Sequence, residues 1–179
     1  VYKRQTADSI SIQNPNLKTD VFKEKPILTN KVIALVHFGR SGTGLLHSLI
    51  DGHPEVSTLP SIYFSEFFNG SNWARITEGG WSKMVAQFIS NYEVLFDATS
   101  TNSIASISGK WIGSLGRKTG MANLGEHKNE ILSVDKKVFS EELNRLMACH
   151  MRLDAFTFFK LVHYAFNKAL NDYNKKRLI

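Results

Sequence analysis

The stretch KVIALVHFGRSGTGLLHSLIDGHPEV (Lys31–Val56) decides which fold this chain can adopt. Its first part, VIALVHF at 32–38, is a continuous apolar run that is typical of a strand buried on both faces of a parallel sheet. A glycine-rich turn follows, and GTGLLHSLIDG at 42–52 has the leucine spacing of a short amphipathic helix that ends before Pro54. The order strand, turn, helix predicts an α/β fold with a parallel sheet flanked by helices.

The rest of the chain continues this alternation. Periodicity predicts helices at 80–92, 140–151 and 154–173, a second buried strand at 93–100, and the start of a further strand at 175–179. Ser140 is the expected start of the second of these helices, and Asp154 is the expected cap of the third. The segment 57–73 is predicted to be an aromatic, turn-rich connector, and 101–129 a glycine-rich loop region.

These elements predict one domain preceded by a leader. We interpret residues 1–30 as a polar leader and residues 31–179 as the N-terminal part of a single α/β domain. The chain starts without methionine and stops where a strand is expected to begin. We therefore expect a fragment of a longer protein, with a sheet that is incomplete at the C-terminus.

Composition narrows the classes of partner. The 179 residues are 42% hydrophobic with a net charge of +6, which is ordinary for a globular domain. Basic residues are dispersed from Lys3 to Arg177, whereas a nucleic-acid binder would cluster them, so no nucleic-acid partner is predicted. No apolar stretch has the roughly 20 residues that a membrane span needs. Cys149 is the single cysteine, which excludes an intrachain disulfide and favours a reducing, cytoplasmic location.

The turn HFGRSGTG (37–44) combines features that suit a bound oxyanion. Its glycines let the backbone approach a ligand closely, and Arg40 adds a permanent charge whose fork matches tetrahedral oxyanions. The following helix presents N–H groups that have no intrahelical partner, at the positive end of its dipole. The sequence therefore predicts an anion site the size of phosphate or sulfate, formed by Gly39, Arg40, Ser41, Gly42, Thr43, Gly44 and Leu45.

Two common nucleotide-binding motifs do not fit this turn. The Walker pattern needs a lysine and a hydroxyl residue at the helix start, but Leu45 and Leu46 follow Gly44 here. The dinucleotide fingerprint G-x-G-x-x-G is absent as well. The turn is thus P-loop-like in layout without the lysine of nucleotide kinases.

The segment GRSGTGLLHSLIDGHPEV resembles the 5′-phosphosulfate-binding loop of PAPS-dependent sulfotransferases, most closely the bacterial and tyrosylprotein type. That family has the pattern R-S-G-T-T-L-L, a short gap, and then H-P-x-V. Gly44 departs from the pattern, because the family usually has a second threonine there. The matching residues are Arg40, Ser41, Gly42, Thr43, Leu45, Leu46, His53, Pro54 and Val56.

The resemblance implies a P-loop NTPase-like fold and transfer of a sulfuryl group from 3′-phosphoadenylyl sulfate (PAPS) to a hydroxyl or amine of a small-molecule or carbohydrate acceptor. It implies that Arg40 stabilises the leaving phosphate, and it makes Glu66 the candidate base. No metal is predicted, and neither the oligomeric state nor the family's 3′-phosphate-binding element can be assigned from the sequence. Two alternatives stay open: a small-metabolite kinase with a variant P-loop, and a non-catalytic anion-binding domain.

Three other polar residues have simpler interpretations. His53 precedes a proline and is expected to fix the turn after the first helix. Cys149 and His150 are adjacent, a spacing that does not suit zinc, so Cys149 is expected to be a core thiol. Asp97 ends a predicted strand and is a weaker candidate for the site.

Overall fold

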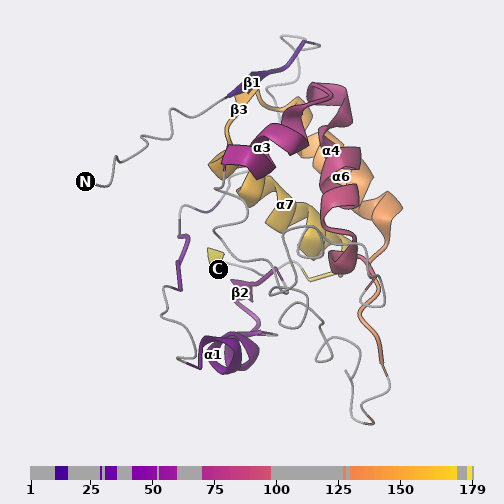
Figure 1. The fold of residues 1–179 in the computed structure, drawn as a ribbon. Coiled ribbons are helices and arrows are strands. Elements are labelled where there is room, and N and C mark those ends of the chain that lie inside the picture. Colours follow the sequence, from indigo (N-terminus) through magenta and orange to yellow (C-terminus); the bar gives the residue numbers. More distant parts are fainter. Residues whose placement is uncertain are drawn as a thin grey trace, which may run out of the picture.

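The structure is a computed structural model that describes residues 11–15, 29, 31–35, 42–51, 53–59, 70–97, 127, 130–172 and 177–178. It is a mixed fold of helices and short strands (Figure 1). The α-helices are α1 (Thr43–Ile50), α3 (Gly70–Thr77), α4 (Met84–Asn91), α6 (Lys136–Ala148) and α7 (Ala155–Ala169), and the 3₁₀ helices are η2 (Trp81–Lys83) and η3 (Glu93–Leu95). The strands are β1 (Ile12–Gln13), β2 (Val56–Ser57), β3 (Arg152–Leu153) and β4 (Arg177–Leu178).

The two longest described helices begin at aspartates. Asp154 accepts a hydrogen bond from the N–H of Thr157 at 2.6 Å, which confirms the predicted cap of α7. Asp135 caps α6 by accepting from the first-turn N–H groups of that helix. The predicted start at Ser140 was therefore wrong: this serine lies one turn inside α6, and its hydroxyl donates to the carbonyl of Lys136 at 2.6 Å. Serine can form this internal bond as readily as a cap, so its identity alone did not mark the helix end.

Aromatic side chains hold α3, α4, α6 and α7 together. Phe88 of α4 is fully buried at their centre, with ring centroids 5.8 Å from Phe139, 5.7 Å from Phe158 and 4.9 Å from Tyr92. Pairs in such tilted or offset arrangements contribute about 0.5–1.5 kcal/mol each beyond the burial of apolar area. The predicted apolar stripe of α7 lies in this core, as expected, with Phe158, Phe159, Val162 and Phe166 all buried.

Two segments differ from their predicted structure. The expected strand at 93–100 was wrong over residues 93–96, because η3 occupies Glu93–Leu95 and the N–H groups of Phe96 and Asp97 both donate to the carbonyl of Glu93 at 3.0 Å. Asp97 forms an isolated antiparallel bridge with Ser133, and residues 98–100 lie outside the described part of the chain. Burial of Leu95 and Phe96 explains the apolar run equally well in a helical turn, since short apolar runs do not distinguish the two. The end of the predicted connector at 57–73 forms α3 instead, and Trp73 anchors that helix in the core.

Three short segments of the chain form a small parallel sheet. β2 and β4 pair in parallel, and the N–H of Arg177 donates to the carbonyl of Glu55 at 3.1 Å. On its other side β4 pairs with residues 31–33: the N–H of Ile33 donates to Leu178 at 2.8 Å, and Val32 forms a parallel bridge with Leu178. The order across the sheet is therefore residues 31–33, β4, β2, which confirms a parallel arrangement and the predicted strand near the C-terminus.

The expected first strand is only partly as predicted. Val32 forms an isolated bridge, and Ile33 is 41% exposed. The run is thus not buried on both faces over residues 32–35, and residues 36–38 lie outside the described part of the chain. An apolar run indicates that burial is possible, but neighbouring elements decide whether it occurs.

A second, antiparallel pair ties the start of the chain to the helices. β1 pairs with β3, with Ile12 opposite Leu153, and the backbone N–H of Asn14 donates to Met151 at 2.8 Å. β1 belongs to the predicted polar leader, so these residues of the leader pair with the rest of the chain. Among the described helices, none has the length and apolar character that crossing a membrane requires.

Candidate functional site

The start of α1 combines a left-handed glycine with helical N–H groups that have no intrahelical partner. Gly42 precedes the helix with φ 78° and ψ 12°, in the left-handed region where a side chain would be strained. The first intrahelical bond runs from the N–H of Leu46 to the carbonyl of Gly42 at 3.0 Å. The N–H groups of Thr43, Gly44 and Leu45 consequently have no partner within the helix. Gly42 is the N-cap residue and has no side chain that could cap them. Such a helix start favours a negative group.

The structure describes four of the predicted site residues and not the others. Gly42, Thr43, Gly44 and Leu45 lie together at the start of α1, as the sequence predicted for a helix there. The side chain of Leu45 is 68% exposed and is therefore not part of the core. The predicted residues Gly39, Arg40, Ser41 and Glu66 lie outside the described residues, as does the side chain of Thr43.

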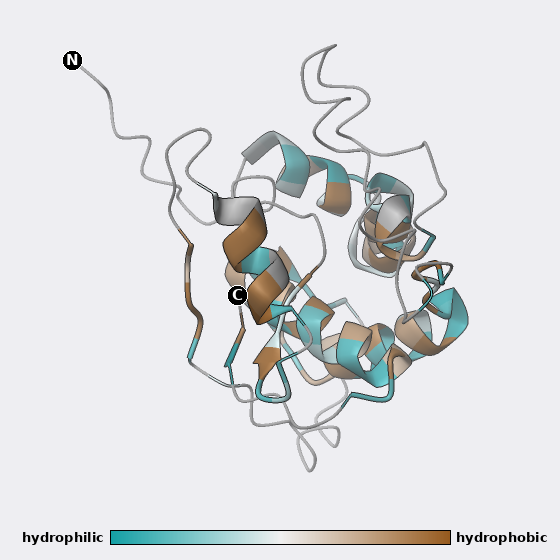
Figure 2. Ribbon diagram, turned by 90° about the horizontal axis from the view of Figure 1, so that it is seen from below, coloured by the Kyte–Doolittle hydropathy of each residue, from teal (hydrophilic) through white to brown (hydrophobic). Residues whose placement is uncertain are grey.

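The leucine face of α1 points away from the rest of the protein. Leu46 is 46% exposed and Leu49 73% exposed, while Ile50 is half-buried. Figure 2 shows hydrophobic ribbon over much of α1 at the near side of the molecule. α1 is therefore held to the fold by contacts other than the packing of these leucines.

Polar bonds hold the C-terminal end of α1. Asp51 follows the helix, its N–H donates to the carbonyl of His47 at 2.8 Å, and its carboxylate accepts from the Thr58 hydroxyl at 2.5 Å. His53 fixes the turn that follows, as predicted, because its Nδ1 accepts from the N–H of Glu55 at 3.1 Å. The chain thus leaves α1, turns within a few residues, and enters β2 in a defined position.

A buried polar cluster lies between β2 and α7. The Ser57 hydroxyl donates to Asn167 Oδ1 at 3.0 Å, and its oxygen lies 2.8 Å from His163 Nδ1. Because the serine proton is directed at Asn167, we assign the imidazole proton to Nδ1, which donates to Ser57. His163 Nε2 is then an acceptor, and within the described part of the chain it is buried without a hydrogen-bond partner. Complete burial lowers the pKa of His163 to about 3, so the ring is neutral.

This cluster does not have the arrangement of a nucleophilic triad. In a triad the imidazole lies between the nucleophile and an orienting group, whereas here Asn167 contacts Ser57 and not the ring. The cluster joins α7 to β2 and has a structural role. The sequence analysis missed it; the available signal was a histidine and an asparagine one turn apart on the otherwise apolar face of α7.

α7 also contacts the first strand of the sheet. The N–H of Thr29 donates to the Tyr164 hydroxyl at 2.8 Å, and Thr29 Oγ1 accepts from the N–H of Lys31 at 3.2 Å. One turn of α7, from His163 to Asn167, therefore contacts both β2 and Thr29, two residues before the segment 31–35. This places α7 against the sheet on the face opposite α1 (Figure 1).

Glu55 lies at the amino end of the parallel sheet. It precedes β2 and forms an ion pair with Arg177 at 3.2 Å, where β4 begins. The ion pair therefore joins the amino ends of β2 and β4. The anion turn, our name for the predicted site at residues 39–45, instead follows the segment 31–35 in the sequence.

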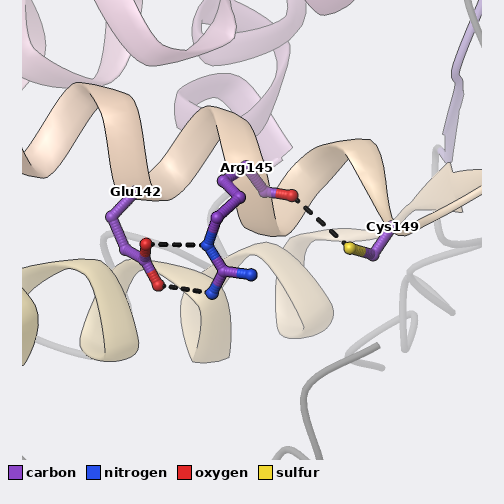
Figure 3. Close-up of polar contacts among 3 residues, drawn as sticks. All are labelled: Glu142, Arg145 and Cys149. Atoms are coloured by element: carbon purple, nitrogen blue, oxygen red, sulfur yellow. Dashed lines mark hydrogen bonds and ion pairs between the residues drawn. The ribbon is translucent and has the colours of Figure 1, made fainter. Parts of the chain in front are cut away.

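Cys149 is the core thiol that the sequence predicted. It is buried at the end of α6, and its Sγ lies 3.5 Å from the carbonyl of Arg145 (Figure 3). Arg145 forms two hydrogen bonds with Glu142, at 2.7 and 2.9 Å, which hold the pKa of that carboxyl below its usual range. Across the described ranges, no group of three His, Cys, Asp or Glu side chains is arranged to hold a metal ion.

Comparisons of the chain with protein-family models, with curated proteins and with solved structures gave no match.

Proposed function

We propose that this chain binds PAPS at the turn formed by residues 39–45 and transfers its sulfuryl group to an acceptor hydroxyl or amine. The observation that carries the proposal is the start of α1. A left-handed Gly42 leads directly into a helix whose first N–H groups have no intrahelical partner, immediately after the Arg40-Ser41 pair of the phosphosulfate-loop pattern.

The parallel sheet supports the same proposal. Open parallel sheets bind ligands outside the carboxyl ends of their strands. The segment 31–35 runs parallel to β4 and β2 and precedes residues 39–45 in the sequence, which supports a site at that edge. We propose that the fold is P-loop NTPase-like, with β4 between the first strand and β2 and with α1 and α7 on opposite faces.

The proposed reaction is an in-line displacement at sulfur. The acceptor oxygen or nitrogen forms a bond to sulfur while the bond from sulfur to the bridging phosphate oxygen breaks, and adenosine 3′,5′-bisphosphate leaves with the electron pair. Negative charge grows on the bridging oxygen, where the Arg40 guanidinium and the α1 N-terminus would stabilise it. The acceptor proton passes to a base, for which Glu66 is the candidate.

The direct test is isothermal titration of the full-length protein with adenosine 3′,5′-bisphosphate. Arg40→Glu should weaken binding by about 10- to 100-fold, because a charge-assisted contact is replaced by repulsion. Lys137→Glu is the matched control: it makes the same change in net charge at an exposed position of α6. Equal affinities of wild type and Arg40→Glu would contradict the proposal.

Product analysis separates the proposal from its alternatives. Incubation of the protein with PAPS and candidate acceptors, followed by mass spectrometry, should give a sulfated product. Binding without any product favours a non-catalytic anion-binding domain. Phosphorylation that depends on ATP and Mg²⁺ would favour a variant P-loop kinase and contradict the sulfotransferase assignment.

A further inference from the structure

Ser57, the last residue of β2, and Thr58, which follows it, contact helices on opposite sides of the sheet. Ser57 is hydrogen-bonded to His163 and Asn167 of α7. Thr58 donates instead to Asp51, at the end of α1, at 2.5 Å. This alternation follows from the extended backbone, in which successive side chains point to opposite faces. The chain at residues 57–58 is therefore hydrogen-bonded both to α7 and to the end of α1.

α1 depends on such polar contacts more than the other described helices do. Its leucines are exposed, whereas α3, α4, α6 and α7 each bury large apolar side chains in the core. A hydrogen bond from a hydroxyl to a carboxylate is stronger than one between neutral groups. Here Thr58 is buried and Asp51 is exposed. The contact at Thr58 is thus well suited to set where the end of α1 lies on the sheet.

The end that Thr58 holds is the end opposite the anion turn. α1 has eight residues, so its two ends are about 12 Å apart. Over that length a tilt of about 5° about the Asp51 end moves the first N–H groups by about 1 Å. Displacements of this size at a ligand-orienting group are enough to reduce binding and rate substantially.

We propose that Thr58 is a positioning residue for the anion turn: its hydrogen bond to Asp51 fixes the end of α1 to the chain that leaves β2, and thereby aims the N–H groups of Thr43, Gly44 and Leu45 at the ligand. This inference rests on the proposed function for its ligand, adenosine 3′,5′-bisphosphate. The attachment of α1 through Thr58 can be measured without the ligand.

The experiment compares three variants of the full-length protein with wild type. Thr58→Val removes the hydroxyl at nearly constant volume, and Thr58→Ser keeps it. Ser57→Ala is the matched control, because it breaks the neighbouring polar contact on the α7 face of the same strand. Each protein is measured for affinity toward adenosine 3′,5′-bisphosphate, for hydrogen–deuterium exchange of the α1 amides, and for thermal unfolding.

Thr58→Val should bind the bisphosphate about tenfold more weakly and exchange its α1 amides faster, with little change in the unfolding temperature of the helical core. Thr58→Ser should stay close to wild type in both respects. Ser57→Ala should lower the unfolding temperature, since it leaves groups of His163 and Asn167 unpaired, while α1 exchange relative to the core stays unchanged.

The outcomes separate the two proposals. If wild type binds and Thr58→Val matches it in affinity and in α1 exchange, the positioning role is overturned and the proposed function stands. If wild type does not bind, the proposed function fails; unchanged α1 exchange in Thr58→Val then overturns the attachment as well, and faster exchange supports it. Equal losses in Thr58→Ser and Thr58→Val would show that the hydroxyl is not the cause.

Discussion

The helical core and the region around α1 are held together by different forces. In the core, α4, α6 and α7 contribute fully buried aromatic and aliphatic side chains around Phe88. Around α1, the leucines of the helix are exposed, and the described contacts are hydrogen bonds at Asp51, His53 and Thr58. The comparison indicates that stability resides mainly in the first region, whereas the region around α1 depends on a few hydrogen bonds and is expected to have a lower local stability.

Replacing one leucine in each region by alanine tests this difference most strongly. Leu143→Ala in α6 should reduce the free energy of unfolding by about 2–5 kcal/mol, because a fully buried side chain leaves a cavity. Leu49→Ala in α1 should change it by less than about 0.5 kcal/mol, since that side chain is already exposed. Urea titrations followed by circular dichroism measure both. Similar losses would show that α1 packs against something that stabilises the whole fold.

Acid should lower the free energy of unfolding, because His163 is buried as a neutral ring between α7 and β2. Burial lowers the pKa of this histidine to about 3 in the folded protein, against about 6.5 in an unfolded chain. The unfolded state therefore takes up a proton that the folded state excludes, and stability is lost as the pH falls from about 6.5 toward 3. Between pH 7 and pH 5 the loss is about 2 kcal/mol.

Urea unfolding at the two pH values measures this loss, with His163→Gln as the control. The variant cannot titrate at this position, so its stability should change less with pH than that of wild type. An identical pH dependence in both proteins would contradict the assignment of a neutral, buried ring.

A smaller loss of stability is expected from a substitution at Gly42, the residue that precedes α1. Gly42→Ala should cost about 1–2 kcal/mol, because φ is 78° and an added Cβ is strained even though it meets no atom within 4 Å. Gly70→Ala is the matched control, since that glycine starts α3 without a positive φ and also has open space around its Cβ position. It should be neutral or stabilising by about 0.4–1 kcal/mol. Thermal unfolding of both variants distinguishes backbone strain from steric contact.

The sequence predicted best where one residue type has one physical role. α7 was predicted with its cap because Asp154 and a long apolar stripe agree, and α1 was predicted because leucine spacing and Pro54 bound it. The strand near the C-terminus was also predicted correctly. In each case local pattern and tertiary burial favour the same structure.

The sequence failed where several structures satisfy the same pattern. The apolar run at 93–97 fits a buried helical turn as well as a strand, and Ser140 forms an internal hydrogen bond instead of a cap. The Ser57–His163 contact joins residues that are 106 positions apart, so no local pattern could reveal it. For the candidate site, the sequence predicted the helix start at Gly42 but not the polar contacts behind it.

The central claim is that a bisphosphate nucleotide binds at the start of α1, and a crystal structure of the protein with adenosine 3′,5′-bisphosphate tests it most directly. We predict that the 5′-phosphate lies within hydrogen-bonding distance of the N–H groups of Thr43, Gly44 and Leu45, with the Arg40 guanidinium beside it. Nucleotide density elsewhere, with these N–H groups bonded to the protein itself, would contradict the claim.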